Sequence, residues 1–442
     1  MLKSESRRPQ PGRILLERFR QGLELYGILH FGMNTFTDRE WGYGDEALSQ
    51  FALVSFEADQ IVRCCRAGGL QGLIMVCKHH DGFCLWPSAT TTHTIASTSF
   101  QGGHGDLVRD LSDSCRKFGL RFGVYVSPWD RNSALYGTPA YVTEVFQAQV
   151  REVLSSYGPV FEMWFDGANG GDGYYGGARE TRKIPAGYYR WEETIAMVRQ
   201  LQPDCAIFGD ADGSHLRWPG NESGFCDPEC RATFWTKAEA AAQGHGDSED
   251  KGRGCRDGSR FCQPECDFPL RPGWFYHASQ EGRGRTPEQL VAIYLSSVGR
   301  GGAMNIGIAP DQQGRVCPAD AVILANFHAR RQALFSRRVF STPDAEAASA
   351  LGGQPFNVVV LREDVAEGER VDGYRLQVQT DGAWRDLLSG ESIGVKRIRV
   401  LPASVSAAAV RLLVTDDAGS HGRVGLDVYL ADFEPQMNTD KH

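Results

Sequence analysis

The chain has 442 residues, 47 basic and 55 acidic, which gives a formal net charge of −8 at neutral pH. This length exceeds one ordinary hydrophobic core and predicts two domains. The sequence has no basic stripe and no long apolar run, so we expect neither nucleic acid nor a membrane as a partner. Residues 1–9 lack the apolar core of a secretory signal, which favours a cytoplasmic location unless a signal has been removed.

Apolar runs with the character of buried strands recur through the first 310 residues, at 25–30, 72–77, 121–126, 160–165, 205–209, 274–277 and 302–308. Helical patterns lie between them, at 58–67, 106–118, 139–157, 188–201 and 286–298. This alternation predicts an α/β fold, a (β/α)8-like barrel over residues 1–338, with the active site where the strands end. A doubly wound sheet is disfavoured because no Gly-rich phosphate loop follows the first strand.

The pattern changes near residue 336. Short runs that alternate apolar and polar residues follow at 356–361, 373–379, 397–401 and 409–414, separated by turn residues. Such runs are typical of an antiparallel β-sandwich, which we assign to residues 339–442. Residues 319–338 are expected to form the last helix of the barrel and to lead into the sandwich.

Asp166 is the most informative single residue. It follows the apolar, aromatic-rich run 160–165 directly and is itself followed by Gly167. A carboxylate at the end of a buried strand is costly to desolvate, so a residue of this type usually has a chemical role. The alternative is an aspartate that only caps the following turn.

The barrel segment is also rich in tryptophan, and Trp86 and Trp129 fall in loop-like contexts rather than in strands. Aromatic faces beside acids are typical of sugar-binding sites. Hydrolysis of a glycoside normally needs two carboxylates. Glu222 is a candidate partner for Asp166, because Trp218 lies close by in the chain and an aromatic face can keep an acid protonated. Spacing alone leaves other candidates open, namely Glu40, Glu162, Asp210 and Glu265.

Two features raise the question of a metal. His79 and His80 are adjacent, so their side chains leave a strand in different directions, and hydrogen bonding to sugar hydroxyls is the better use for them and for His30. We expect no metal or cofactor in the catalytic centre. Residues 240–256 have the composition of a flexible insertion, and the cysteines around it are compatible with a structural zinc or with disulfides: Cys226, Cys230, Cys255, Cys262 and Cys266.

A set of motifs resembles the α-L-fucosidases of glycoside hydrolase family 29. The matching segments are HFGMNTF (30–36), EWG (40–42), KHHDGF (78–83), WPS (86–88), GVYVSPW (123–129), WFDGA (164–168) and RPGWFYH (271–277). The extended versions DGANG (166–170) and WPGNE (218–222) resemble the subgroup that acts on α-1,3 and α-1,4 linked fucose in branched, Lewis-type glycans. That subgroup typically carries a carboxyl-terminal β-sandwich.

The resemblance implies a retaining double displacement on fucosylated oligosaccharides or glycoconjugates. Asp166 matches the nucleophile, Glu222 matches the acid/base, and Trp274 matches an aromatic residue near the C5 methyl group. Other matches are to positions that contact the fucose hydroxyls or ring: His30, Glu40, Trp41, His79, His80, Tyr125 and Trp164. The alternatives are a broad-specificity fucosidase, another retaining hydrolase such as an α-galactosidase, and a non-catalytic sugar-binding protein. The sequence does not indicate an oligomeric state.

Overall fold

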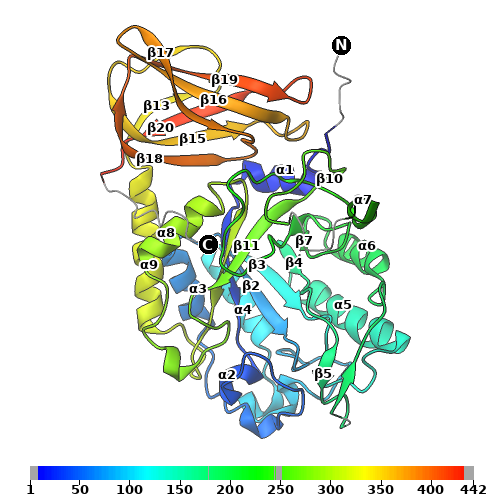
Figure 1. Ribbon diagram of the computed structural model, residues 1–442. Coiled ribbons are helices and arrows are strands. Elements are labelled where there is room, and N and C mark those ends of the chain that lie inside the picture. The colour runs from blue at the N-terminus through cyan, green and yellow to red at the C-terminus, as the bar shows by residue number, and fades with distance from the viewer. Residues whose placement is uncertain (1–7, 178, 243, 245–250, 433–442) are drawn as a thin grey trace.

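The computed structural model describes residues 8–177, 179–242, 244 and 251–432. Parallel strands form a closed barrel in the order β1-β12-β11-β8-β7-β4-β3-β2 (Figure 1). Their bounds are β1 (Leu25–Leu29), β2 (Gly72–Lys78), β3 (Arg121–Val126), β4 (Glu162–Trp164), β7 (Ala206–Phe208), β8 (Leu216–Arg217), β11 (Gln263–Pro269) and β12 (Ala303–Ile308). The predicted (β/α)8-like barrel is confirmed.

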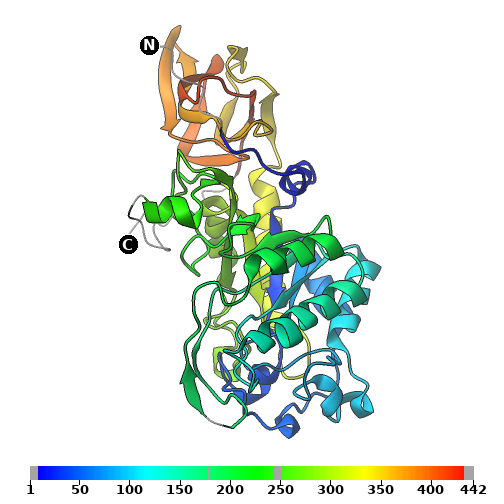
Figure 2. The same ribbon diagram turned by 90° about the vertical axis from the view of Figure 1, so that its right-hand side faces the viewer.

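The helices lie outside the strands in both views (Figures 1 and 2). The longer ones are α1 (Arg13–Arg20), α3 (Ala58–Ala67), α4 (Leu107–Phe118), α5 (Gln147–Ser156), α6 (Trp191–Leu201), α8 (Pro287–Ser296) and α9 (Pro318–Leu334). The short ones are α2 (Met33–Thr37), α7 (Lys237–Ala242), a π-helix at Tyr141–Phe146 and 3₁₀ helices at Leu48–Gln50, Ile95–Ser97, Phe100–Gly103 and Ala278–Gln280. No helix of the described chain is long and apolar enough to cross a membrane.

Local sequence explains where these helices begin and end. Asp106 precedes α4 and accepts a hydrogen bond from the backbone N–H of Arg109 at 2.9 Å, and α4 ends at Gly119, whose φ of 68° suits glycine. Thr286 caps α8 in the same way, and Pro287 occupies its first turn. These capped helices cover the barrel and fix the strand ends that carry the candidate site.

The centre of the barrel is polar at its amino end. Arg18 of α1 forms a buried ion pair with Glu162 of β4 at 2.9 Å. The hydroxyl of Tyr26 donates to Glu265 of β11 at 2.5 Å, and the amide of Asn305 donates to the same carboxylate at 2.9 Å. Buried charges of this kind are tolerated only when paired and hydrogen-bonded, so this network belongs to the framework of the barrel.

The carboxyl-terminal strands form two antiparallel four-stranded sheets, β13-β20-β15-β18 and β14-β19-β16-β17. Their bounds are β13 (Arg338–Thr342), β14 (Ser349–Ala350), β15 (Pro355–Glu363), β16 (Val371–Thr380), β17 (Ala383–Gly390), β18 (Arg397–Ser406), β19 (Ala409–Asp417) and β20 (Val424–Tyr429). The sheets enclose a hydrophobic core of their own. The predicted antiparallel sandwich is confirmed.

The sandwich lies at the amino end of the barrel, beside α1 and far from α2 (Figure 1). The backbone N–H of Ile398 donates at 2.9 Å to the carbonyl of Gly299, just before β12. The guanidinium of Arg397 is buried and donates to the carbonyls of Pro228 and Cys230 at 2.8 and 3.0 Å. The opposite end of the barrel, where the strands finish, is therefore left clear of the sandwich.

One predicted strand is wrong. Residues 274–277 form a loop, and the barrel strand of this region is β11, which ends at Pro269. The backbone N–H groups of Trp274 and Phe275 donate to the Glu40 carboxylate instead of to a neighbouring strand. The structure adds a hairpin of β5 (Gly171–Gly173) and β6 (Glu180–Arg182) and the short pair β9 (Thr233–Phe234) and β10 (Arg260–Phe261). Part of the insertion expected at 240–256, namely 243 and 245–250, lies outside the described residues.

Candidate active site

Asp166 lies just beyond β4 at the carboxyl end of the barrel. Its Oδ2 accepts a hydrogen bond from the hydroxyl of Tyr125 at 2.8 Å, and its Oδ1 accepts one from the backbone N–H of Ala168 at 2.7 Å. His80 Nε2 stands 3.7 Å from Oδ2. Burial raises the pKa of Tyr125 well above its usual value, so this hydroxyl stays protonated and remains a donor. The carboxylate is therefore held in a fixed orientation.

Three histidines line the same end of the barrel. Burial lowers the pKa of His30 to about 3 and that of His80 to about 4, and it lowers the pKa of His79 well below the ordinary value. All three rings are therefore neutral near pH 7. The Nδ1 atom of His79 is buried and has no hydrogen-bond partner within the described part of the chain, whereas His30 also interacts with the backbone of Ile28. Such ring nitrogens are suited to hydroxyl groups of a ligand.

The tautomer of His80 follows from its neighbours. The Ser127 hydroxyl donates to the carbonyl of Trp129 at 2.8 Å, so its oxygen is left as an acceptor for His80 Nδ1, 2.7 Å away. Nδ1 then carries the hydrogen, and Nε2 offers a lone pair beside Asp166. His80 can accept a hydrogen bond from a hydroxyl at that point.

Aromatic rings form the walls of the site. Trp164 stacks between Tyr125, at a centroid distance of 5.2 Å, and Phe208, at 4.1 Å. Trp41 meets the His80 ring edge-on at 5.3 Å and is 52% exposed, so it lies at the open rim. A buried stack with one exposed indole at the rim provides both a rigid floor and a face for a sugar.

Glu222 and Trp274 meet although 52 residues separate them. The indole Nε1 of Trp274 donates to Oε2 of Glu222 at 3.1 Å. The ring of Trp274 packs over Gly307 of β12, where a Cβ would stand only 2.8 Å from the indole. Glycine is required there because any larger residue would displace the indole that holds Glu222.

Glu40 supports the loop that carries Trp274. Its carboxylate accepts hydrogen bonds from the backbone N–H groups of Trp274 at 2.9 Å and Phe275 at 3.3 Å, and it contacts His277 Nε2 at 2.6 Å. Burial lowers the pKa of His277, but the hydrogen bonds that the ring donates to Glu40 and Asp38 outweigh it and raise the pKa above the ordinary value. Glu40 therefore fixes the position of Trp274.

Two of the alternative carboxylates lie deeper in the barrel. Glu162 is fully buried and paired with Arg18, and Glu265 accepts the indole N–H of Trp164 at 2.9 Å besides its bonds to Tyr26 and Asn305. Their hydrogen bonds and ion pairs are made within the protein framework. They are therefore poorer candidates than Glu222 for a carboxylate that works beside Asp166.

Sequence reasoning missed one carboxylate. Asp267 of β11 is 4% exposed, and no described group forms a hydrogen bond to its Oδ1. The missed signal was its place in the chain, two residues after Glu265 and so on the same face of a strand. The sequence pattern predicts the strand of this region at 274–277 instead, which leaves Asp267 outside it.

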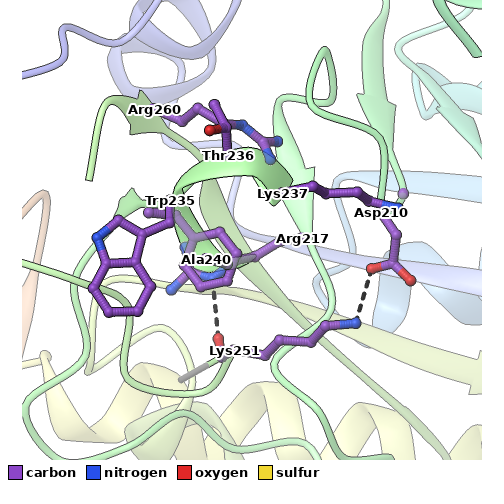
Figure 3. A pocket seen from close by; sticks show the side chains of 10 residues that line it. Asp210, Arg217, Trp235, Thr236, Lys237, Ala240, Lys251 and Arg260 are labelled. Atoms are coloured by element: carbon purple, nitrogen blue, oxygen red, sulfur yellow. Dashed lines mark hydrogen bonds and ion pairs between the residues drawn. The ribbon is translucent and has the colours of Figure 1, made fainter. Parts of the chain in front are cut away.

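Asp210, the remaining alternative, borders a side pocket (Figure 3). Its Oδ1 pairs with Lys251 Nζ at 3.1 Å, and its Oδ2 lies 3.0 Å from where a Cβ of Gly167 would stand. Lys251 Nζ also lies 5.6 Å from the centre of the Trp218 ring. This ion pair thus connects the loop after β4 with the loop that carries Glu222. No helix separates β7 from β8. The residues that line the pocket are Gly209, Asp210, Arg217, Phe234, Trp235, Thr236, Lys237, Ala240, Lys251 and Arg260.

No disulfide bond links any of the twelve cysteines in the structure. Cys226, Cys230 and Cys266 cluster in the interior, with 3.1 Å between the sulfurs of Cys226 and Cys266. Cys255 and Cys262 are buried elsewhere in the same segment. Within the described residues, no group of three or more potential ligands could hold a metal ion. The disulfides considered for this segment are thus not formed in this structure.

Comparison with known proteins agrees with this architecture. The family model for alpha-L-fucosidase matches residues 26–328. The chain is 30% identical to alpha-L-fucosidase 1 of Arabidopsis thaliana over 428 residues, which cover 88% of this chain and 81% of that protein.

Solved structures give the same result. A glycoside hydrolase 29 family member from an unknown rumen bacterium superposes with a TM-score of 0.89 at 36% identity, covering 98% of this chain and 80% of that one. The structure of SpGH29 has a TM-score of 0.85 at 30% identity, covering 97% of this chain and all of that one. The chain belongs to the alpha-L-fucosidases, glycoside hydrolases of family 29.

Proposed function

We propose that this alpha-L-fucosidase is a retaining exo-enzyme in which Asp166 is the nucleophile and Glu222 the general acid and base. The observation that carries the proposal is the fixed carboxylate of Asp166, oriented by Tyr125 and Ala168 at the open end of the barrel. A nucleophile must be held in line with the bond it attacks, and two hydrogen-bond donors provide that orientation.

The first half-reaction forms an ester. A carboxylate oxygen of Asp166 attacks C1 of the fucosyl group while the carboxylic acid of Glu222 gives its proton to the departing glycosidic oxygen. The C1–O bond to the leaving sugar breaks with its electron pair, and a β-linked fucosyl ester remains on Asp166. In the second half, Glu222 takes a proton from water, the water oxygen attacks C1, and Asp166 departs.

The side chains around Asp166 offer groups that suit a deoxy sugar. Neutral His30, His79 and His80 offer ring nitrogens to hydroxyl groups without adding positive charge. The Trp274 indole offers an apolar face to the C5 methyl group, and Trp41 offers one at the rim. We assign the same binding roles to Tyr125 and Trp164, and Glu40 acts by holding Trp274 in place.

For the substrate, we propose fucose linked α-1,3 or α-1,4 in branched, Lewis-type glycans. Support comes from the segment at 218–222, which resembles that subgroup, and from the Lys251–Asp210 pair that fixes this segment beside the loop after Asp166. A leaving group with a neighbouring sugar would contact both loops and supply binding energy to the transition state.

A panel of substrates tests this proposal. Lewis-type trisaccharides should be cleaved well, whereas 2′-fucosyllactose and a nitrophenyl fucoside should be cleaved poorly. Rapid turnover of the aryl fucoside with no gain on branched glycans would assign the chain to the broad-specificity fucosidases. A nitrophenyl α-galactoside serves as the control for the other retaining hydrolase considered above, and fucose binding without any turnover would indicate a non-catalytic protein.

A further inference from the structure

Asp267 occupies a position in the barrel that the reaction described above does not use. It lies on β11, in register with Asn305 of β12 and two residues after Glu265. Glu265 points into the barrel, where it meets Tyr26, Trp164 and Asn305. Because side chains alternate along a strand, Asp267 shares that inner face, one layer nearer the end where the strands finish.

The carboxyl group of Asp267 lacks the partners that buried acids normally have. Its carboxylate interacts with its own backbone N–H, but no described lysine, arginine or histidine pairs with it, its Oδ1 has no hydrogen-bond donor, and the residue is only 4% exposed. An isolated buried carboxylate would be very costly, and such groups take up a proton instead. Burial, followed by repulsion from Glu265, Glu222 and Asp166, raises the pKa of Asp267 well above its usual value.

These charged neighbours also locate Asp267 relative to the chemistry. Glu222 and Asp166, the two carboxylates of the proposed reaction, are both close enough to repel it, and Glu265 repels it from the layer below. Asp267 thus lies on the inner face of β11, between the layer of Glu265 and the end of the barrel where the strands finish. A protonated carboxyl group is a hydrogen-bond donor.

We propose that Asp267 is a further substrate-binding residue, whose neutral carboxylic acid donates a hydrogen bond to a hydroxyl oxygen of the sugar held between Asp166 and Glu222. The inference rests on the proposed sugar site. It explains why a costly, unpartnered polar group is kept in the interior, because polar groups left unsatisfied in the free protein become satisfied by the ligand.

Asp267→Leu tests the proposal because leucine has nearly the same shape and no polar atoms. Removing an unpartnered polar group from the interior should raise the melting temperature of the free protein. The same change should weaken competitive inhibition by L-fucose, and lower kcat/KM, by roughly ten- to a hundredfold. A merely structural residue would give a lower melting temperature and unchanged fucose affinity.

Asp267→Asn separates the neutral donor from a carboxylate. The amide keeps a donor and cannot ionise, so kcat/KM near pH 6 should stay within about threefold of wild type. Equal losses in the Asn and Leu variants would overturn the proposal, since they would show that the charged form is needed. The infrared difference spectrum between wild type and Asp267→Asn should contain the carbonyl band of a protonated acid, and that band should shift when L-fucose binds. Absence of the band would equally contradict the proposal.

Glu363→Gln is the matched control. Glu363 is a buried acid of the sandwich, and its carboxylate accepts hydrogen bonds from the backbone N–H groups of Arg370, Val371 and Gly394. Its replacement should lower stability and leave fucose inhibition unchanged. Wild-type protein that neither binds L-fucose nor cleaves fucosides would refute the proposed function, whereas an active wild type with unaffected Asp267 variants would refute only this inference.

Discussion

At the scale of single residues, the sharpest prediction concerns Asp166. Asp166→Gly should lose at least about 10⁴-fold in kcat because the ester can no longer form. Azide should then attack the substrate directly and yield the β-fucosyl azide. A 2-fluoro-fucosyl reagent should label Asp166 in the wild-type enzyme, and peptide mass spectrometry reads out the site. Labelling of Asp210 or Glu162 would disprove the assignment.

Tyr125→Phe is the graded companion to that experiment. It removes the 2.8 Å hydrogen bond to Asp166 and leaves the carboxylate itself. A hydrogen bond to a charged group contributes about 1.5–3 kcal/mol, so kcat/KM should fall by roughly 10- to 150-fold. A loss as complete as that of Asp166→Gly would mean that the tyrosine does more than orient the nucleophile.

The acid/base role proposed for Glu222 predicts losses that depend on the leaving group. Glu222→Ala should lower kcat/KM for a branched trisaccharide by roughly 10²–10⁴-fold and affect an activated aryl fucoside much less, because a good leaving group needs no proton. Azide should rescue turnover by attacking the fucosyl ester and should yield the α-fucosyl azide. The anomer formed, identified by NMR, therefore distinguishes Glu222 from Asp166. Equal losses on both substrate types would contradict the acid/base role.

The element scale shows what could be predicted from the sequence and what could not. Asp166 could be found because it directly follows an apolar run with the character of a buried strand, which is a local signal. Asp267 could not be found because the apolar run at 274–277 has strand character and predicts the barrel strand there instead of at β11. The backbone N–H groups of Trp274 and Phe275 in that run in fact donate to Glu40, more than 230 residues away. The residues alone gave Glu222 as one of several candidate carboxylates, and only the family motif singled it out, since its contact with Trp274 is made by the fold and has no counterpart in local spacing.

The Asp210–Lys251 pair couples two loops, and it gives a prediction about substrate size. Lys251→Met should free the segment at 218–222 and lower kcat/KM for branched glycans by roughly 3- to 10-fold, with a smaller effect on an aryl fucoside. The melting temperature should change little because Asp210 is partly exposed. The control is Arg253→Met, which removes an exposed ion pair with Glu391 from the same stretch. It should leave kcat/KM unchanged for both substrates. Equal losses of kcat/KM on both substrates would show that the Asp210–Lys251 pair does not act on the leaving-group side of the site.

Glu363 predicts how stability depends on pH. Burial raises its pKa from 4.5 to about 7 in the folded protein. The folded state then binds more protons than the unfolded state between these values, so the contribution is fully present below about pH 4.5 and is lost as the pH rises through about 7. The loss is at most about 3 kcal/mol. Urea unfolding at several pH values should show that the free energy of unfolding falls between pH 4.5 and 7 more steeply for wild type than for Glu363→Gln. The same pH dependence in both proteins would contradict this prediction.

At the scale of the whole molecule, we propose that residues 1–338 and 339–442 are two domains that depend on each other. Asp372 of the sandwich is buried and accepts from Arg8 at 2.7 Å and from Arg231 at 2.8 Å. Truncation after Arg338 would leave both cations without this partner and should cause aggregation. A milder test is Arg397→Met, which should lower stability by about 1–3 kcal/mol and leave kcat unchanged. A soluble, stable truncation that loses only glycan binding would make the sandwich a binding module.

The sandwich occupies the end of the barrel opposite the loops that follow the strands (Figure 1). The molecule can therefore be attached to a surface through the sandwich, while the opposite end of the barrel must remain accessible to substrate. Enzyme anchored to a bead through an added cysteine or biotin on the outer strand β17 should keep its rate on small substrates and should still reach fucose on intact glycoproteins. The same anchor placed on the hairpin of β5 and β6 should block the large substrates first.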